Sequence, residues 1–109
     1  MDTINNVVTS LVKDFRGVVG VGFKDLKTGK EFYFNGDKQF LTASVFKIFV
    51  IIELYNQAIC GIVNLDERYT LSETDKVLGS GILQEMQEGL QPTIRDLAKL
   101  MMILSDNTA

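Results

Sequence analysis

The sequence predicts an α+β fold, in which a helix and a β-hairpin form part of a sheet beside a mainly helical region. Three observations predict it. Apolar residues recur at helical spacing over residues 3–15, two short apolar runs flank a turn at residues 25–29, and helical periodicity dominates the second half. We therefore expect residues 1–109 to belong to a single domain, with the helix and hairpin in residues 1–42 and the helical region in residues 43–109.

The first expected helix has one apolar face and is followed by Gly17. That face comprises Ile4, Val7, Val8, Leu11, Val12 and Phe15. Residues 18–23 are predicted to form a buried strand, because Gly20 and Gly22 interrupt the apolar run and permit close packing. Residues 31–35, which include three consecutive aromatic side chains, are predicted to be its hairpin partner.

Residues 43–58 predict a helix that is apolar on nearly all sides. Such a helix must be covered on nearly all sides, so we expect it at the centre of the domain. Gly61 is placed to end it. After a mostly polar loop, Gly79-Ser80-Gly81 predicts a turn and residues 82–87 predict a short helix.

The last predicted helix begins at Thr93, which has the capping-box spacing to Asp96. Its expected buried side comprises Ile94, Leu97, Ala98, Leu100, Met101 and Leu104. Ser105-Asp106-Asn107 follows at its end.

Composition excludes several classes of function. The chain has 46% hydrophobic and 23% charged residues and a net charge of -3, which is typical of a folded protein and unfavourable for binding nucleic acid. No apolar stretch reaches the roughly 20 residues needed to cross a membrane, so we expect no membrane partner. The sequence has no histidine, which excludes Ser-His-Asp catalysis and histidine metal sites, and we expect neither metal nor cofactor. The single cysteine, Cys60, is expected to be a small buried filler. The N-terminus lacks the pattern of a signal peptide, so we expect a cytoplasmic protein or a mature secreted form.

Ser44-Val45-Phe46-Lys47 has the spacing S-x-x-K at the start of the central helix. A serine hydroxyl needs a base to become a good nucleophile, and without histidine the candidate base is Lys47. Residues at i and i+3 share one helix face. The positive end of the helix dipole and burial both disfavour an ammonium there, and the helix start offers free backbone N–H groups for an oxyanion hole.

Two further motifs resemble catalytic ones but have structural explanations. Ser10-Leu11-Val12-Lys13 repeats the S-x-x-K spacing, but Ser10 lies within a helix, where its backbone N–H is already used. Lys27-Thr28-Gly29 spells K-T-G between two predicted strands, where a hairpin turn explains it.

S-x-x-K followed by S-D-N resembles the signature of the class A β-lactamase and penicillin-recognising serine hydrolase family. The matching segments are Thr42 to Lys47, Gly79 to Leu83, Leu90 to Ala98 and Ser105 to Ala109. The resemblance implies the α/β sandwich of serine β-lactamases and hydrolysis of a β-lactam amide bond. It implies Ser44 as the acylated nucleophile, Lys47 as proton acceptor or relay, and Ser105 as a proton shuttle to the departing nitrogen. Asn107 would bind the acyl amide of the substrate, and Asp106 would brace the turn.

The family also has a deacylating glutamate and a K-T-G strand after S-D-N, so we expect this chain to be the N-terminal portion of such a domain. The segment before Gly81 lacks the aromatic residue that many β-lactamases carry at the site rim, which weakens a β-lactam as the natural substrate. The expected partner is thus a small molecule, either a β-lactam or a D-Ala-D-Ala-like peptide.

Other interpretations stay open. The chain can be a D-Ala-D-Ala peptidase-like hydrolase, or a non-catalytic fragment that self-associates or needs a complementing C-terminal chain. Both motifs can also be coincidental in an unrelated α+β binding domain.

Overall fold

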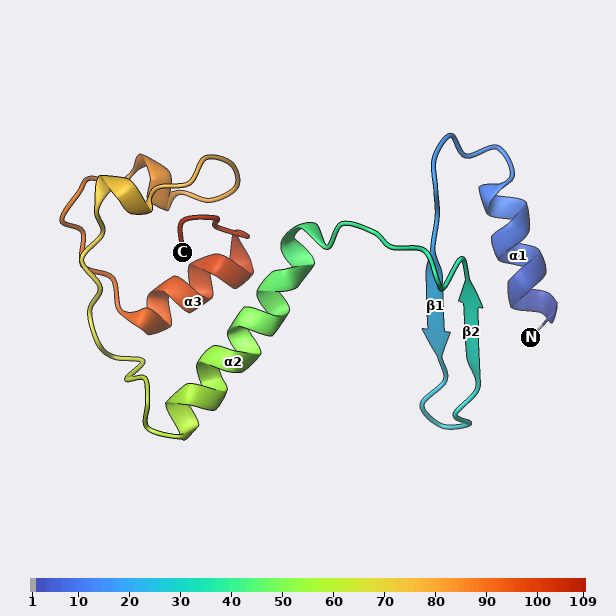
Figure 1. Ribbon diagram of the computed structural model, residues 1–109, viewed down its shortest axis with the longest axis horizontal. Coiled ribbons are helices and arrows are strands. Elements are labelled where there is room, and N and C mark those ends of the chain that lie inside the picture. Colours follow the sequence, from blue (N-terminus) through green and yellow to red (C-terminus); the bar gives the residue numbers. More distant parts are fainter. Residues whose placement is uncertain (1) are drawn as a thin grey trace. The chain divides into compact units, whose positions relative to one another are not determined.

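The computed structural model describes residues 2–109 and divides the chain into two compact units (Figure 1). The first unit ends at Leu41 and the second extends from Thr42 to Ala109. The single domain over residues 1–109 stays a prediction. In the described part of the chain, no helix is both long enough and apolar enough to span a membrane.

The first unit contains the predicted helix and hairpin. Helix α1, Asp2–Val12, is followed by strands β1, Val21–Lys24, and β2, Glu31–Phe34. The strands are antiparallel, with Val21 opposite Phe34 and Lys24 opposite Glu31. The helix ends three residues earlier than its apolar pattern predicts, because Phe15 N–H bonds back to the Val12 carbonyl and closes a turn. Within residues 3–12 of α1, the half-buried side chains are Ile4, Val8 and Val12, a stripe spaced by four residues.

The hairpin turn accounts for the upstream K-T-G sequence. The Asp25 carboxylate accepts hydrogen bonds from the backbone N–H of Lys27 at 2.9 Å and from the Thr28 hydroxyl at 2.7 Å. Gly29 has a φ of +69°, a conformation that glycine adopts without strain. These bonds close a tight turn, so the motif is structural here, as predicted.

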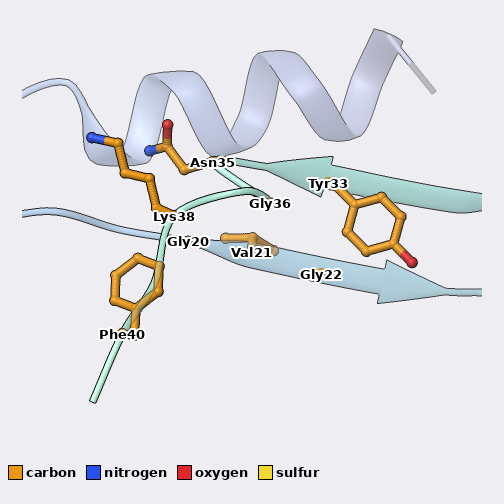
Figure 2. A pocket seen from close by; sticks show the side chains of 8 residues that line it. All are labelled: Gly20, Val21, Gly22, Tyr33, Asn35, Gly36, Lys38 and Phe40. Atoms are coloured by element: carbon orange, nitrogen blue, oxygen red, sulfur yellow. The ribbon is translucent and has the colours of Figure 1, made fainter. Parts of the chain in front are cut away.

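The expectation that the first strand is buried is wrong. Phe23 and Tyr33 are exposed, and among the described residues β1 pairs only with β2, so each strand has a free edge. Figure 2 shows a shallow pocket of about 270 Å³ beside β1, between the Phe40 ring and Tyr33. A side chain at Gly20 would collide with that ring. No predicted site residue lines this pocket.

The second unit is mainly helical. It comprises the 3₁₀-helix η1, Ala43–Phe46, helix α2, Lys47–Ile59, the 3₁₀-helices η2, Glu73–Asp75, and η3, Leu83–Glu85, and helix α3, Ile94–Ile103. Among the described residues, the buried apolar core comprises Leu71, Leu83, Ala98 and Met101. This core packs α3 against the loop segments between α2 and α3, and α3 also packs against α2 (Figure 1).

Three predictions of burial are wrong, all at surfaces that the unit itself leaves uncovered. Helix α2 was expected to be enclosed, but only its first residue, Lys47, is buried. Its exposed large apolar residues are Ile48, Phe49, Val50, Ile52, Tyr55 and Ile59. Cys60 and Leu104 are exposed because each is the C-cap of a helix, where the chain leaves the packed face. After Cys60, Gly61 has a φ of +72° and ends the helix as predicted.

Helix α3 begins at the predicted capping box. The Thr93 hydroxyl accepts from Asp96 N–H at 3.1 Å, and the Asp96 carboxylate accepts from Thr93 N–H at 3.3 Å. The preceding residues are tied to the extended segment at residues 69–71, because Tyr69 N–H bonds to the Pro92 carbonyl and Leu71 N–H to the Leu90 carbonyl, each at 2.9 Å. These bonds fix where α3 starts and therefore where its C-terminal turn lies.

Asp106, just beyond α3, is 1% exposed and braces two turns. Its Oδ2 accepts from the backbone N–H of Ile82 at 2.7 Å and of Leu83 at 3.0 Å. Its Oδ1 accepts from the N–H of Thr108 at 2.9 Å and of Ala109 at 3.2 Å. Burial acts to raise the pKa of this carboxyl, but the four backbone donors outweigh burial and hold the pKa below its ordinary value. The bracing role expected for Asp106 is confirmed.

Replacement of this carboxylate should destabilise the second unit strongly. In Asp106→Asn the side chain keeps one acceptor oxygen and turns an NH₂ toward two N–H donors, which should lower the free energy of unfolding by about 2–4 kcal/mol near neutral pH. Because the folded pKa is depressed, the stabilisation is present above the unfolded value and is lost as pH falls through the folded value. When urea unfolding is measured as a function of pH, the difference in free energy of unfolding between wild type and Asp106→Asn should therefore become smaller below about pH 4.

Asp37→Asn is the matched control, since Asp37 is exposed. The free energy of unfolding of Asp37→Asn should equal that of the wild type at every pH. If the difference in free energy of unfolding between wild type and Asp106→Asn stayed constant down to about pH 2, the role assigned to the charge would be contradicted.

Candidate active site

Ser44 and Lys47 enter the site from the start of helix α2. Ser44 lies in η1 and Lys47 is the first residue of α2. The entry is sharp, because Ala43 has a φ of +43°, a left-handed conformation that is strained for a residue with a side chain. Ser44 is exposed, whereas Lys47 is only 5% exposed. The hydroxyl is therefore open to solvent while the amine behind it is enclosed.

Ser105 enters the site through a second left-handed residue. Helix α3 ends at the C-cap Leu104, and Ser105 follows with a φ of +53°. This conformation places both the carbonyl and the hydroxyl of Ser105 on the Lys47 amine. Strained backbone of this kind persists only where surrounding bonds hold it, here the Asp106 brace on the next residue.

Lys47 donates to three acceptors that come from the S-D-N turn. They are the Ser105 carbonyl, the Ser105 hydroxyl at 3.1 Å and Asn107 Oδ1 at 2.8 Å. Three acceptors match the three N–H donors of an ammonium group. Among residues 2–109, no carboxylate lies within ion-pair distance of Lys47. The amine is therefore held by neutral acceptors alone.

The Ser105 hydroxyl links the Ser44 hydroxyl to the Lys47 amine. It donates to Ser44 Oγ at 2.8 Å and accepts from Lys47 Nζ. The structure thus brings together the three residues that the sequence predicts as catalytic, although 61 positions separate the two serines. Spacing alone suggested that Lys47 acts on Ser44 within one helix turn. In the structure, the hydrogen bonds that link their two side chains run through Ser105.

Asn107 completes the group and contacts two different segments. Its Oδ1 accepts from Lys47, while its Nδ2 donates to the Leu78 carbonyl at 3.4 Å. Its backbone N–H donates to the Ser80 carbonyl at 2.8 Å. A carboxamide nitrogen has two N–H groups, so one remains for a ligand. Asn107 is exposed, which leaves that group accessible.

The loop before η3 forms one wall of the site, in keeping with the rim position that the family resemblance implies for the segment before Gly81. Gly79 and Gly81 both have positive φ, +125° and +111°, and a side chain at either would collide with Asn107 or Asp106 respectively. Thr108 joins the same loop through hydrogen bonds with both backbone groups of Val77. The pair of glycines around Ser80 was a usable signal, because closely spaced glycines often mark a close backbone approach.

In the described chain, no group of three or more histidine, cysteine, aspartate or glutamate side chains is arranged to hold a metal ion. The site groups are two hydroxyls, an amine and a carboxamide. Such groups suit proton transfer and hydrogen bonding to a carbonyl substrate.

Comparison with known proteins agrees with this geometry. A family model described as the β-lactamase enzyme family matches residues 1–109. Beta-lactamase L2 from Stenotrophomonas maltophilia is 31% identical over 100 residues, which are 92% of this chain and 33% of that protein. Beta-lactamase PSE-4 from Pseudomonas aeruginosa is 32% identical over 91 residues, which are 84% of this chain and 31% of that protein.

Solved structures give the same result. The β-lactamase of Sphaerobacter thermophilus superposes with a TM-score of 0.87 at 34% identity, covering 98% of this chain and 40% of that one. A variant of PBP-A, solved as an acyl-enzyme complex with penicillin G, superposes with a TM-score of 0.89 at 27% identity, covering 99% and 41%. The predicted fold class is thereby confirmed. The chain spans about a third of the length of the curated relatives it matches. Because the family model covers every residue, the chain belongs to the β-lactamase enzyme family.

Proposed function

We propose that this chain carries the acylating centre of a serine hydrolase that attacks the amide carbonyl of a β-lactam with Ser44. One observation carries the proposal: the hydrogen-bonded series from Ser44 Oγ through Ser105 Oγ to the buried Lys47 amine. The penicillin G acyl-enzyme of PBP-A supports a β-lactam as a substrate class, since that protein superposes over 99% of this chain.

In the reacting form Lys47 is a neutral amine with a free lone pair, and both serine hydroxyls rotate. Ser44 then donates to Ser105 and Ser105 donates to Lys47, the reverse of the directions in the structure. The Ser44 hydroxyl proton passes to Ser105 Oγ, and the Ser105 proton passes to Lys47 Nζ, as Ser44 Oγ bonds to the lactam carbonyl carbon. A backbone N–H at the start of the helix stabilises the oxyanion. The carbon–nitrogen bond then breaks, and the departing nitrogen takes a proton from Ser105 Oγ, which regains one from the Lys47 ammonium. Asn107 Nδ2 donates its remaining N–H to the acyl amide of the substrate.

A D-Ala-D-Ala-like peptide is the alternative substrate class, because the same groups would acylate on its peptide carbonyl. Gly79, just before Ser80-Gly81, places no side chain at the site rim, and this observation favours the alternative. Release of D-alanine from a synthetic peptide ending in D-Ala-D-Ala, dependent on Ser44, would support a peptidase.

Ser44→Ala should abolish covalent labelling by penicillin G. The β-lactam ring opens without losing atoms, so intact-protein mass spectrometry should show wild type gaining the full mass of the drug. Lys47→Met should slow labelling by about 100-fold or more, since general-base assistance contributes on that scale.

Ser10→Ala is the matched control, because Ser10 has the same S-x-x-K spacing but lies in α1. This variant should label at the wild-type rate. Labelling that survives in Ser44→Ala, or that is lost in Ser10→Ala, would contradict the assignment of the nucleophile.

We also propose that the chain binds a further polypeptide, either a second copy or a complementing chain. The exposed apolar face of α2 supports this, with Phe49 67% and Ile52 62% exposed. Large apolar side chains left exposed together on one helix are typical of an interface. The free edges of the hairpin offer a second place for association.

Sedimentation velocity should detect this association. We expect the weight-average sedimentation coefficient to rise with concentration, and the double variant Phe49→Ser/Ile52→Ser to weaken the rise because it removes apolar area from α2. The control is Leu26→Ser, which replaces an exposed leucine in the hairpin turn. It should leave unchanged the part of the rise in sedimentation coefficient that comes from association through α2. A compact monomer at every concentration would count against self-association.

A further inference from the structure

We infer that Gly79 is a positioning residue for Asn107. Because residue 79 has no side chain, the loop backbone closes on the Asn107 carboxamide and sets which end of it faces Lys47. The catalytic consequence rests on the proposed function, whereas the positioning itself does not.

The contact between Gly79 and Asn107 leaves no room for a side chain. A Cβ added at Gly79 would lie 2.6 Å from Asn107 Nδ2, closer than real Cβ contacts. The φ of +125° at Gly79 also lies in a region that residues with side chains rarely adopt. Backbone conformation therefore favours glycine at this position, and an added side chain would also push on the end of the Asn107 side chain.

The loop cannot easily retreat from Asn107, because the Gln84 side chain holds both backbone groups of Gly79. Gly79 N–H donates to Gln84 Oε1 at 3.2 Å, and Gln84 Nε2 donates to the Gly79 carbonyl at 2.7 Å. The same Nε2 lies 3.2 Å from the Gly81 carbonyl. A side chain at position 79 would therefore displace the Asn107 carboxamide rather than the loop.

The two ends of the Asn107 carboxamide face chemically opposite partners. The Leu78 carbonyl, next to Gly79, can only accept, so it selects the nitrogen. The Lys47 ammonium can only donate, so it selects the oxygen. Displacement of the carboxamide by a methyl group at position 79 would break this arrangement and take one acceptor from Lys47.

The test is a double-mutant cycle on the 109-residue chain, with urea unfolding as the readout. Gly79→Ala lowers the urea midpoint in the wild-type background through both backbone strain and the contact with Asn107. In the Asn107→Ala background the strain remains but the contact is gone, so the drop should be at most about half as large. Equal drops in the two backgrounds would overturn the inference. If Gly79→Ala alone does not fold, a folded Gly79→Ala/Asn107→Ala double variant would support the inference, and an unfolded double variant beside a folded Asn107→Ala would overturn it.

Gly89→Ala is the matched control, because Gly89 has a φ of +89° and no atom within 4 Å of an added Cβ. It should lower the midpoint equally in both backgrounds. In ¹H–¹⁵N spectra, the Asn107 side-chain amide signals, identified by their loss in Asn107→Ala, should shift in Gly79→Ala and stay in place in Gly89→Ala. Unshifted Asn107 signals in a folded Gly79→Ala variant would also overturn the inference.

Acylation gives the functional readout. Labelling of Ser44 by penicillin G should slow by about 10- to 100-fold in Gly79→Ala and stay near wild type in Gly89→Ala, as expected for a misplaced binding group. Absence of labelling in the wild type would defeat the proposed function alone. The unfolding cycle and the spectra would still decide the role of Gly79.

Discussion

The burial of one cationic side chain is the constraint on which the second unit depends. Lys47 stands at the first position of α2, where the helix dipole opposes its charge, and no carboxylate of the described chain compensates it. A buried ammonium is tolerated only when its donors are satisfied, and here the satisfaction comes from one turn, Ser105 to Asn107. The position of that turn therefore determines whether the start of α2 can be buried at all.

The remaining loops of the unit hold that turn in place. Asp106 ties it to the N–H groups that open η3, and Thr108 ties it to Val77. The hydrogen bonds of Asp106 and of Thr108 stabilise the strained conformation of Ser105, which supplies two of the three acceptors on Lys47. Strain and bracing are thus concentrated on the four consecutive residues from Ser105 to Thr108. This is the pattern expected when a site's geometry is imposed by its surroundings rather than by local preference.

Features set by local spacing could be predicted from the sequence. The hairpin, the Thr93–Asp96 cap and the turn at Lys27-Thr28-Gly29 depend on neighbours within a few residues. The two motifs predicted which groups meet, but not their order, because the place of Ser105 between Ser44 and Lys47 depends on how α3 is positioned against α2. Burial on α2 and at the helix ends was predicted wrongly, because apolar periodicity shows which faces need cover and not what supplies it.

Every described hydrogen bond that a side chain makes among the four site residues joins positions 58 to 61 residues apart, and all of them lie in the second unit. Closing so long a loop costs conformational entropy that only the completed packing of α2 and α3 offsets. The hydrogen-bonded series from Ser44 through Ser105 to Lys47 therefore forms only when α2 and α3 pack, since an open chain does not place Ser105 beside either residue. The reactivity of Ser44 would then report the folded population of the second unit, independently of the hairpin.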